Sequence, residues 1–354
     1  MPVRAAINGF GRIGRIAFRV ALANFADQIE IVAVNTSGSL DSTGWAHLLR
    51  YDSVYGKFEK KTETESSGED PEIGALLIDR KKYPILAQRD PSKIPWKKYG
   101  ADVVIESTGI FTSVEGAKQH LTAGAKKVVI SAPGKGDGVG TYVIGANSYE
   151  GEHNIVSNAS CTTNCVAPIA AIMHSKIGVK KATLSTIHAV TAEQNMVDGS
   201  PPGEHSNDLR RARAFQNIIP TTTGAAKATT QAIPELKGLF DGIAIRVPIL
   251  CGSLTDFTFV TSRPTSVEEV NQIFQNATQE PRWRGIVATT NEPLVSTDII
   301  GRTESAIVDL NFTRVVDGDL VKVMAWYDNE WGYATRLIEQ TINIGKTLES
   351  KNTV

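Results

Sequence analysis

Two cysteines in the segment SNASCTTNCVAP, Cys161 and Cys165, are the first residues whose type and spacing could do chemistry. A metal ion would need more ligands than two thiolates, and His153 is the only histidine near them in the sequence. A disulfide within one helical turn is sterically poor and is uncommon in a reducing compartment. A nucleophile fits better, because the dipole and the free amide groups of a helix N-terminus stabilise a thiolate. We therefore favour a nucleophilic thiol and expect no metal site.

Cys161 is the better candidate for that thiol. The pattern TTNCVAPIAAIMHS is helical and Cys161 begins it, whereas Cys165 lies one turn deeper and is expected to pack inside. Cys251, in RVPILCGS, is expected to be a core residue. Without a base nearby, a buried and inert thiol at Cys161 would be an equally good interpretation.

A nucleophilic thiol needs a base, and His188 is the favoured one of the six histidines. It lies at the end of the strand-like segment LSTIHAVTAEQ, where its imidazole could keep the thiol ionised and later carry a proton. The other histidines fall on helical patterns or in polar loops and are expected to be structural or solvated: His47, His120, His153, His174 and His205.

A glycine-rich segment follows the first strand-like stretch. INGFGRIGR carries Gly9, Gly11 and Gly14 in G-x-G-x-x-G spacing, after the strand-like VRAAING and at the start of a helical pattern. Glycines let the backbone approach a pyrophosphate, whose charge then lies at the helix N-terminus. The segment predicts a dinucleotide site, and the alternative is a glycine-rich turn without a ligand.

The end of the second strand bears on which dinucleotide binds. A Rossmann site usually carries an acidic residue there, which binds the ribose 2′-OH. Here EIVAVN is followed by Thr36, Ser37 and Gly38. A carboxylate would repel a 2′-phosphate, whereas hydroxyl and amide groups could accept one. We therefore predict NADP, alone or together with NAD; the alternative is that Asp41 or a water-mediated contact serves NAD.

The first third of the chain alternates strand-like and helical segments, beginning with VRAAING, GRIGRIAFRVALANF, EIVAVN and DSTGWAHLLRYD. It continues through ADVVIEST, VEGAKQHLTAGA, KKVVISAP and the strand-like TYVIGAN. This alternation predicts parallel βαβ units and an α/β, doubly wound Rossmann dinucleotide-binding domain over residues 1–160. ETESSGEDPE, in a more polar stretch, is expected to be an exposed loop or the end of a hairpin.

The pattern changes after Cys161 to long alternating strands, among them KKATLSTIHAVTA, DGIAIRVPI, LTDFTFVTSR and AIVDLNFTRVVDGDLVKVMAWYD. The Asp-Gly pairs in GLFDGI and VVDGDL predict turns. We therefore expect an α+β catalytic domain with an antiparallel sheet over 161–327. The helical segment 328–354 is expected to pack on the first domain, since one helix would not form a domain alone.

The composition excludes several classes of protein. The 354 residues carry a formal net charge of -1, which argues against a nucleic-acid partner. No apolar run approaches the roughly 20 residues of a membrane span, and MPVRAAINGF shows no charged-then-apolar leader. Three cysteines are too few for a disulfide scaffold. We expect a cytoplasmic protein with no membrane and no nucleic-acid partner.

The motifs GFGRIGR, LLRYDSVYG, ESTGIF, SNASCTTNC, IIPTTTGAAKA, RVP and WYDNEWGY occur in the order found in phosphorylating glyceraldehyde-3-phosphate dehydrogenases, and essentially the whole chain resembles that family. The resemblance implies a homotetramer that oxidises D-glyceraldehyde 3-phosphate with inorganic phosphate and NADP or NAD. The product would be 1,3-bisphosphoglycerate, formed reversibly through a Cys161 thioester, in glycolysis, gluconeogenesis or carbon fixation.

Two competing interpretations differ from that one. Erythrose-4-phosphate dehydrogenase resembles the same sequence but hydrolyses the thioester; the intact phosphate residues Ser160, Thr162 and Thr223 favour phosphorolysis. A non-catalytic scaffold or nucleic-acid-binding protein could also keep the fold. The presence of Cys161 and His188 together with the balanced charge argues against it.

The resemblance also assigns roles by position. It makes Cys161 the nucleophile and His188 the base. It implies these cofactor-binding residues: Gly9, Gly11, Arg12, Ile13, Gly14, Thr36, Ser37, Arg89, Ser107, Thr108, Gly109, Ser131, Asn329 and Tyr333. Among them, Asn329 would hold the carboxamide and Tyr333 would pack beside the nicotinamide ring. Thr191 and Arg246 would bind the substrate phosphate, and the attacking phosphate would be bound by Ser160, Thr162, Thr223 and Gly224.

Some positions depart from the family pattern. Thr36 stands where NAD-preferring members carry aspartate, Val190 replaces an aromatic residue and Glu193 replaces an aspartate. The segment NMVDGSPPGEHSNDLRR looks longer than usual, with a Pro-Pro-Gly insertion in a loop that reaches a neighbouring subunit's adenosine pocket in the family. An arginine of DLRRARA is expected to contact phosphate, either Arg210 or Arg211.

Overall fold

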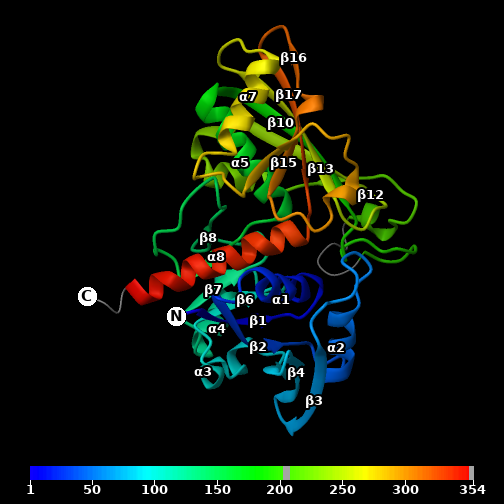
Figure 1. The fold of residues 1–354 in the computed structure, drawn as a ribbon, viewed down its shortest axis with the longest axis vertical. Helices are drawn as coiled ribbons and strands as arrows, with labels where there is room; N and C mark the ends of the chain where they lie inside the picture. Colours follow the sequence, from blue (N-terminus) through cyan, green and yellow to red (C-terminus); the bar gives the residue numbers. More distant parts are fainter. Residues whose placement is uncertain (202–207, 351–354) are drawn as a thin grey trace. The chain divides into compact units, whose positions relative to one another are not determined.

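The computed structural model describes residues 1–201 and 208–350, which form two compact units (Figure 1). Unit 1 comprises Met1–Tyr142, Tyr149–Ala159 and the chain from Ala334, and unit 2 comprises Val143–Ser148 and Ser160–Tyr333. Each unit is built on one large sheet with helices, a mixed α/β architecture that confirms the predicted fold class. None of the helices in the described part of the chain is long and apolar enough to cross a membrane.

Unit 1 contains a nine-stranded sheet in the order β3-β4-β5-β2-β1-β6-β7-β9-β8. Strand β1 pairs in parallel with both β2 and β6, so the strand order reverses at β1, the position where Rossmann folds bind ligands. Its strands are β1 Val3–Asn8, β2 Ile29–Asn35, β3 Thr62–Glu69, β4 Glu72–Ile78, β5 Lys81–Leu86, β6 Val103–Glu106, β7 Lys127–Ile130, β8 Gly140–Thr141 and β9 Ile155–Ser157.

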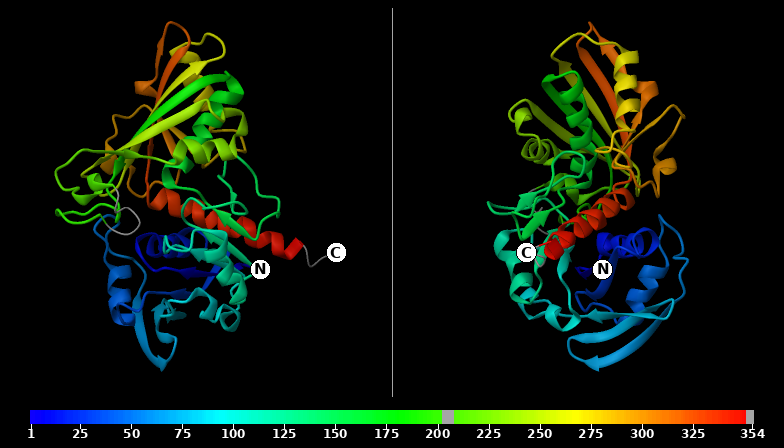
Figure 2. Two further views of the ribbon diagram at one scale, coloured as in Figure 1. Left: turned by 180° about the vertical axis from the view of Figure 1, so that it is seen from behind. Right: turned by 60° about the vertical axis from the view of Figure 1, so that its left-hand side comes forward.

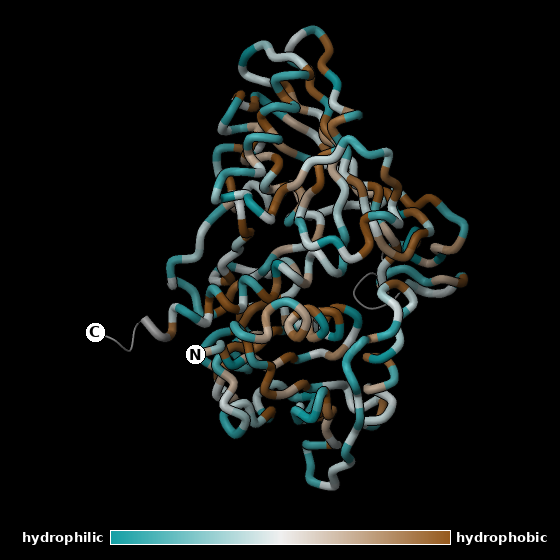
Figure 3. The backbone as a smooth tube through the Cα atoms, in the orientation of Figure 1, coloured by the Kyte–Doolittle hydropathy of each residue, from teal (hydrophilic) through white to brown (hydrophobic). Residues whose placement is uncertain are grey.

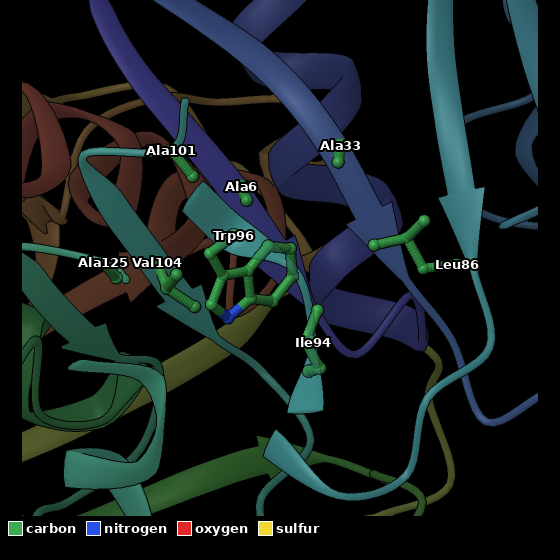
Figure 4. Close-up of a cluster of buried hydrophobic side chains, with 8 residues drawn as sticks. All are labelled: Ala6, Ala33, Leu86, Ile94, Trp96, Ala101, Val104 and Ala125. Atoms are coloured by element: carbon green, nitrogen blue, oxygen red, sulfur yellow. The ribbon is translucent and has the colours of Figure 1, made fainter. Parts of the chain in front are cut away.

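The helices of unit 1 are α1 Arg12–Asn24, α2 Ser42–Arg50, α3 Trp96–Tyr99, α4 Val114–Thr122 and most of α8 Trp331–Ser350. Strands β6 and β7 are buried along their whole length, as expected for the parallel centre of a covered sheet. A buried cluster around Trp96 fills one side of the sheet (Figure 4). Helix α8 packs closely on the first strand: a Cβ on Gly345 would lie 2.2 Å from the Val3 side chain.

Two details of unit 1 refine the sequence analysis. The polar segment ETESSGEDPE forms strands of the antiparallel β3–β4 hairpin, whose tip is hydrophilic in Figure 3. The prediction of a strand at TYVIGAN was wrong, because only Gly140 and Thr141 pair with β9 and the chain then turns. The side-chain amide oxygen of Asn147 accepts from the Val143 backbone N–H at 2.8 Å, which favours the turn over a strand.

Unit 2 contains an eight-stranded sheet in the order β11-β12-β10-β13-β17-β15-β14, with β16 paired to β17. Most neighbours are antiparallel, but β10 and β12 are parallel, as are β14 and β15. Its strands are β10 Val179–Ala189, β11 Ile219–Thr222, β12 Phe240–Val247, β13 Ser253–Thr261, β14 Val287–Thr290, β15 Ala306–Asp309, β16 Arg314–Val316 and β17 Leu320–Tyr327.

The helices of unit 2 are α5 Cys161–Lys176, α6 Ala225–Ala232 and α7 Val267–Ala277. Helix α5 contacts β10, β13, β15 and β17 as well as α6 and α7, and Figure 2 shows these helices beside the sheet. Almost every residue of α5 from Thr162 to Met173 is buried, so its start is held rigidly against the strands. That rigidity matters because the first residue of α5 is Cys161.

The two Asp-Gly pairs behave differently. Asp317 and Gly318 have φ angles of 48° and 75° and form the turn between β16 and β17, as predicted. The turn predicted at Asp241-Gly242 was wrong, because both residues lie inside β12 and pair with β10. Gly242 is required there for packing, since a Cβ would lie 2.5 Å from the Leu184 side chain.

Candidate functional site

Helix α5 begins at Cys161, as the sequence predicted. Ser160 is its N-cap, with extended backbone angles, and its side-chain oxygen accepts from the Thr163 backbone N–H at 3.1 Å. Just before it, Ala159 has a φ of 55°, a left-handed conformation that turns the chain from β9 into the helix. This local geometry places the thiol in the first turn, where helix amides and the dipole act on it.

The structure brings the predicted nucleophile and base together. The Cys161 sulfur lies 3.3 Å from Nε2 of His188, although 27 residues separate them in the chain. His188 is at the end of β10 and is 2% exposed, whereas Cys161 is half-buried and accessible from outside. Cys165 and Cys251 are buried, in agreement with the packing roles expected for them.

Arg246 contacts the other nitrogen of the same imidazole. His188 and Arg246 are directly paired residues of the parallel strands β10 and β12. Nη1 of Arg246 lies 2.8 Å from Nδ1 of His188 and donates to the Ala189 carbonyl at 2.9 Å. Nδ1 also lies 2.7 Å from that carbonyl. If Nδ1–H donates to Ala189, Nε2 is free of a proton and can accept one from the thiol; if Nδ1 accepts from Arg246, Nε2–H faces the sulfur.

Burial of the pair favours its neutral form. Burial raises the pKa of the Cys161 thiol, although the Arg246 charge and hydrogen bonds from Thr162 oppose that rise. Burial and the Arg246 charge lower the pKa of His188 to about 3. The ligand-free protein therefore favours a neutral thiol beside a neutral imidazole, not the ionised thiol expected from the helix position alone. A neutral imidazole can accept the thiol proton on Nε2 when Nδ1 carries the hydrogen.

A tyrosine that the sequence analysis did not single out lies against the pair. The Tyr327 hydroxyl is 3.0 Å from the Thr162 hydroxyl and 2.8 Å from that of Thr186, and the Tyr327 ring meets His188 edge-on. Burial raises the pKa of Tyr327, so the phenol keeps its proton. The only signal in the sequence was its place in WYDNEWGY. Thr162 therefore turns its side chain inward, to Tyr327.

Donors for an anion surround Thr191. Arg246 Nη1 lies 3.5 Å from the Thr191 hydroxyl, and the Gln194 side-chain oxygen accepts from the Thr191 backbone N–H at 2.9 Å. Within the described residues, Nε of Arg246 and Nε2 of Gln194 are buried and have no hydrogen-bond partner. Buried donors of this kind are rare without a ligand, and Gln194 was missed by the sequence analysis.

Arg210 and Arg211 have different surroundings in the structure. Arg211 is buried, and its Nη1 donates to Glu193 Oε2 at 2.5 Å, the oxygen that also lies 3.9 Å from Nη2 of Arg246. Arg210 is exposed and donates to the Pro220 carbonyl at 3.4 Å. Arg211 and Arg246 thus share one carboxylate, whereas Arg210 points elsewhere.

Thr223 and Gly224 lie at the start of α6, where Gly224 is the N-cap. The Thr223 hydroxyl accepts from the Ala225 backbone N–H at 3.2 Å, and no atom of the described residues lies within 4 Å of a Cβ placed on Gly224. The helix start is therefore open for a small anion.

The three glycines of unit 1 have different physical roles. Gly9 has a φ of +98°, and a Cβ on it would lie 2.7 Å from the backbone of Thr108. A Cβ on Gly14 would lie 2.0 Å from the Gly9 carbonyl oxygen. Gly11 is the N-cap of α1, with no side-chain cap, and within the described part of the chain no atom lies within 4 Å of its Cβ position. Gly9 and Gly14 close the turn, and Gly11 leaves room at a helix N-terminus, as a pyrophosphate requires.

Arg12 and Ile13 follow in the first turn of α1 and are half-buried. Arg12 pairs with Asp52 and lies over the Tyr55 ring. Burial would raise the pKa of Asp52, but the Arg12 hydrogen bond and two backbone N–H groups lower it overall. The Asp52 carboxylate therefore fixes the direction of the Arg12 guanidinium.

Hydroxyl groups and one guanidinium gather after β2. Thr36 is buried; its hydroxyl donates to the Leu86 carbonyl at 3.0 Å and accepts from the Gly38 N–H. Ser37 is exposed, with its hydroxyl 2.9 Å from that of Ser39 and its carbonyl accepting from Arg89 Nε at 3.3 Å. The Asp41 carboxylate caps α2 instead, accepting from the Gly44 N–H at 2.8 Å. Ser39 is a further residue that the sequence analysis missed.

The remaining predicted cofactor residues lie at strand ends. Ser107, Thr108 and Gly109 directly follow β6, and Ser131 follows β7. In unit 2, Asn329 is buried, and its Oδ1 accepts from the Gly252 N–H at 3.2 Å and the Ser253 hydroxyl at 2.9 Å. These donors fix the amide so that Oδ1 is its accepting end and Nδ2 its donating end. Tyr333 is buried two residues into α8.

In the described part of the chain no group of three or more His, Cys, Asp and Glu residues could hold a metal ion. The Pro-Pro-Gly insertion extends into residues 202–207, with His205, which lie outside the described residues. Val190 follows β10 and is half-buried.

Comparison with known proteins identifies the family. The family model for the NAD binding domain of glyceraldehyde 3-phosphate dehydrogenase matches residues 3–114. The model for the C-terminal domain of the same enzyme matches residues 160–329. The chain is 46% identical over 351 residues to the glyceraldehyde-3-phosphate dehydrogenase of Zymomonas mobilis subsp. mobilis, covering 98% of this chain and 100% of that protein. It is 46% identical over 352 residues to glyceraldehyde-3-phosphate dehydrogenase 2 of Streptomyces arenae, covering 98% and 100%. It is 47% identical over 341 residues to glyceraldehyde-3-phosphate dehydrogenase 2 of Trichormus variabilis, covering 95% and 97%. The chain therefore belongs to the glyceraldehyde-3-phosphate dehydrogenase family of oxidoreductases, with an NAD-binding domain in unit 1.

Proposed function

We propose that this protein is a phosphorylating glyceraldehyde-3-phosphate dehydrogenase that converts D-glyceraldehyde 3-phosphate and inorganic phosphate to 1,3-bisphosphoglycerate through a Cys161 thioester. The observation that carries the proposal is the contact of 3.3 Å between the Cys161 sulfur and Nε2 of His188. A half-buried thiol beside a buried neutral imidazole is suited to attack an aldehyde carbon and pass its proton to nitrogen.

The residues supply each step of the chemistry. The sulfur attacks the aldehyde carbon while His188 Nε2 takes the thiol proton and passes it to the carbonyl oxygen, giving a neutral hemithioacetal. His188 Nε2, neutral again, takes the hydroxyl proton as the hydride leaves the carbon. The oxidised nicotinamide cofactor, when bound, accepts the hydride. Phosphate attacks the resulting thioester, and the departing sulfur returns to the thiol with a proton from His188. We assign the backbone N–H of Cys161 to stabilising the oxyanions.

Two anion sites support phosphate chemistry. We assign the substrate phosphate to Thr191 and Arg246, since the buried Nε of Arg246 has no partner in the described structure. Arg211 joins this site in preference to Arg210, because Glu193 links it to Arg246.

We assign the attacking phosphate to the starts of α5 and α6, through Ser160, the backbone of Thr162, Thr223 and Gly224. Helix N-termini with hydroxyl groups are suited to bind a dianion. A site for inorganic phosphate favours phosphorolysis over the hydrolysis expected of an erythrose-4-phosphate dehydrogenase.

The cofactor residues fit a nicotinamide dinucleotide, and we propose that NADP is favoured, alone or together with NAD. The open space at Gly11 suits a pyrophosphate, and the Asn329 Nδ2 suits a carboxamide oxygen. Ser37, Ser39 and Arg89 supply hydroxyls and a positive charge for a 2′-phosphate. Asp41 is engaged as a helix cap, which argues against its use for the ribose of NAD.

An assay with and without inorganic phosphate tests the reaction. We expect reduction of NADP by glyceraldehyde 3-phosphate to require phosphate, and Cys161→Ser to lower kcat by at least about 10³-fold while cofactor binding persists. Turnover that is undiminished without phosphate would exclude the phosphorylating reaction and favour thioester hydrolysis.

Kinetics with the two cofactors test the choice between them. Arg89→Ala is expected to raise the KM for NADP about tenfold and to leave the KM for NAD within about twofold. NAD serves as the internal control, since it lacks the 2′-phosphate. A wild-type enzyme that strongly prefers NAD would show that the hydroxyl cluster does not bind a phosphate.

We also propose a cytoplasmic homotetramer. Large apolar side chains of unit 2 are exposed, among them Val197 at 81%, Leu209 at 74% and Ile218 at 73%, and subunit contacts would cover them. Light scattering should then give a mass four times that of the 38.2 kDa chain. A monomer in dilute solution would contradict this assembly.

A further inference from the structure

A buried carboxylate in unit 1 lies outside the chemistry described above. Glu106, the last residue of β6, is 1% exposed. Its Oε1 accepts from the Thr108 backbone N–H at 2.8 Å and from the Thr108 hydroxyl. Its Oε2 accepts from Asn8 Nδ2 at 2.6 Å and lies 2.9 Å from His120 Nε2. The two oxygens of this almost fully buried carboxylate thus face four polar groups.

The direction of the His120 contact follows from its second partner. The Trp96 indole N–H, which can only donate, lies 3.0 Å from His120 Nδ1. Nδ1 must therefore accept, and the imidazole proton must be on Nε2, pointing at Glu106. Trp96 is held at the centre of the buried cluster shown in Figure 4, and both rings are 0% exposed. The two hydrogen bonds therefore run in one direction, because Trp96 donates to His120 and His120 donates to Glu106.

This chain of hydrogen bonds reaches three adjacent strand ends. Asn8, which ends β1, accepts on Oδ1 from Asn35 Nδ2 at 2.7 Å, and Asn35 ends β2. Asn35 in turn exchanges hydrogen bonds with the backbone of Gln88 at 2.8 and 3.0 Å. Glu106 thus joins the carboxyl ends of β1, β2 and β6.

The segment after Glu106 also lies directly against the glycine-rich loop. The Ser107 hydroxyl donates to the Gly9 carbonyl at 2.7 Å, and a Cβ on Gly9 would lie 2.7 Å from the Thr108 nitrogen. Thr108 is held on its other side by both of its bonds to Glu106. A shift of Thr108 would therefore change the shape of the turn that precedes α1.

We propose that Glu106 is a positioning residue for the dinucleotide: it holds the Ser107–Gly109 segment against the Gly9 turn before the cofactor binds, and Trp96 and His120 orient it. The inference rests on the cofactor site of the proposed function. The physical reason for a glutamate at this position is the number of hydrogen-bond acceptors, because only a carboxylate has an acceptor oxygen on both sides. A side chain with an amide must place an NH₂ group against an N–H donor, which loosens the segment.

Glu106→Gln tests the proposal with almost no change in volume. In calorimetric titrations of the full-length protein with NADP and with NAD, we expect Kd to rise about tenfold or more, with kcat at saturating cofactor within about threefold of wild type. Val103→Ala is the matched control. Val103 is fully buried on the same strand and lies outside the cluster around Trp96, so the change weakens the core and leaves the acceptors of Glu106 intact. This variant should lower Tm without changing Kd.

A second pair of variants decides the matter if Glu106→Gln does not fold. His120→Gln keeps a donor for Glu106 and an acceptor for Trp96, so its Kd should stay within about threefold of wild type. His120→Leu removes both and should weaken binding as Glu106→Gln does. Equal Kd values for His120→Gln and His120→Leu, or a Kd for Glu106→Gln equal to that of wild type, would overturn the inference. A wild-type protein that binds neither cofactor would instead refute the proposed cofactor site.

Discussion

Two helices of this protein begin directly after a strand and a short turn, and their first residues differ. In unit 1, α1 begins behind Gly11, which has no side chain to cap the helix and has open space around it. In unit 2, α5 begins behind Ser160, whose hydroxyl caps the Thr163 N–H, and the next residue is Cys161. Both helix starts offer partial positive charge. We propose that the partial charge at the start of α1 acts on an external anion, whereas the partial charge at the start of α5 acts on a sulfur atom of the protein itself.

The comparison shows how little a helix start does on its own. At α1, close backbone packing of Gly9 and Gly14 shapes the site, so its function depends on the absence of side chains. At α5, burial raises the pKa of the thiol in spite of the helix and Arg246, so the sulfur needs a base to lose its proton. In the proposed mechanism His188, whose Nε2 lies 3.3 Å from the sulfur, supplies that base from another element. An anion site can thus be local, whereas a nucleophile depends on tertiary structure.

The largest effect should come from the glycines of α1. In Gly14→Ala the new Cβ would lie 2.0 Å from the Gly9 carbonyl, so the main chain must move. We expect Kd for the cofactor to rise by about 100-fold or more and Tm to fall clearly. Gly11→Ser has room for its side chain and gains a cap, so Tm should be unchanged or higher while Kd rises about tenfold. Calorimetry measures both quantities.

Cofactor binding by Gly11→Ser that equals that of wild type would mean that the open space is not used by the pyrophosphate. The α1 start would then be a structural turn only, and the contrast with α5 would disappear.

The next effect concerns the partner of the α5 thiol. The pKa of His188 is lowered from 6.5 to about 3 in the folded protein, chiefly by burial. Between these pH values the unfolded chain binds a proton that the folded chain does not, so the stability that depends on neutral His188 is present above pH 6.5 and is lost toward pH 3. Relative to His188→Gln, the wild-type protein should lose about 1.4 kcal/mol per pH unit in this window.

Urea unfolding of both proteins at pH 7, about 5.5 and about 4.5 measures that difference. Other titrating groups are common to the two proteins and cancel. Parallel pH profiles would show that His188 is not held neutral by its surroundings.

Local patterns predicted much of this molecule because local physics decides those parts. The helical pattern that begins at Cys161 predicted the start of α5, and the spacing of the glycines predicted the turn before α1. Asp317-Gly318 forms a turn because both residues take positive φ angles. Asp241-Gly242 has the same two residue types, but pairing with β10 holds them in a strand. No local rule separates the two cases.

Sequence patterns could not predict the contacts in the site that join elements far apart in the chain. Arg246 faces His188 because β10 and β12 pair in parallel in that register, 58 residues apart. The pKa of His188 follows from this contact and from burial. Tyr327, Gln194 and Glu106 were missed for the same reason, since each gains its role from partners on other elements.

The smallest effect concerns the cap of α5. Ser160→Ala removes the acceptor for the Thr163 N–H and should cost about 1 kcal/mol, or a fall of roughly 2–4 °C in Tm. Ser266→Ala is the matched control, because Ser266 caps α7 of the same unit by accepting from the Glu269 N–H at 3.2 Å. Both variants should lose similar stability, but only Ser160→Ala should raise the KM for phosphate, by severalfold. An unchanged KM for phosphate would reduce Ser160 to a cap like that of α7. The α5 start would then serve the thiol alone, and phosphate binding there would depend on the start of α6.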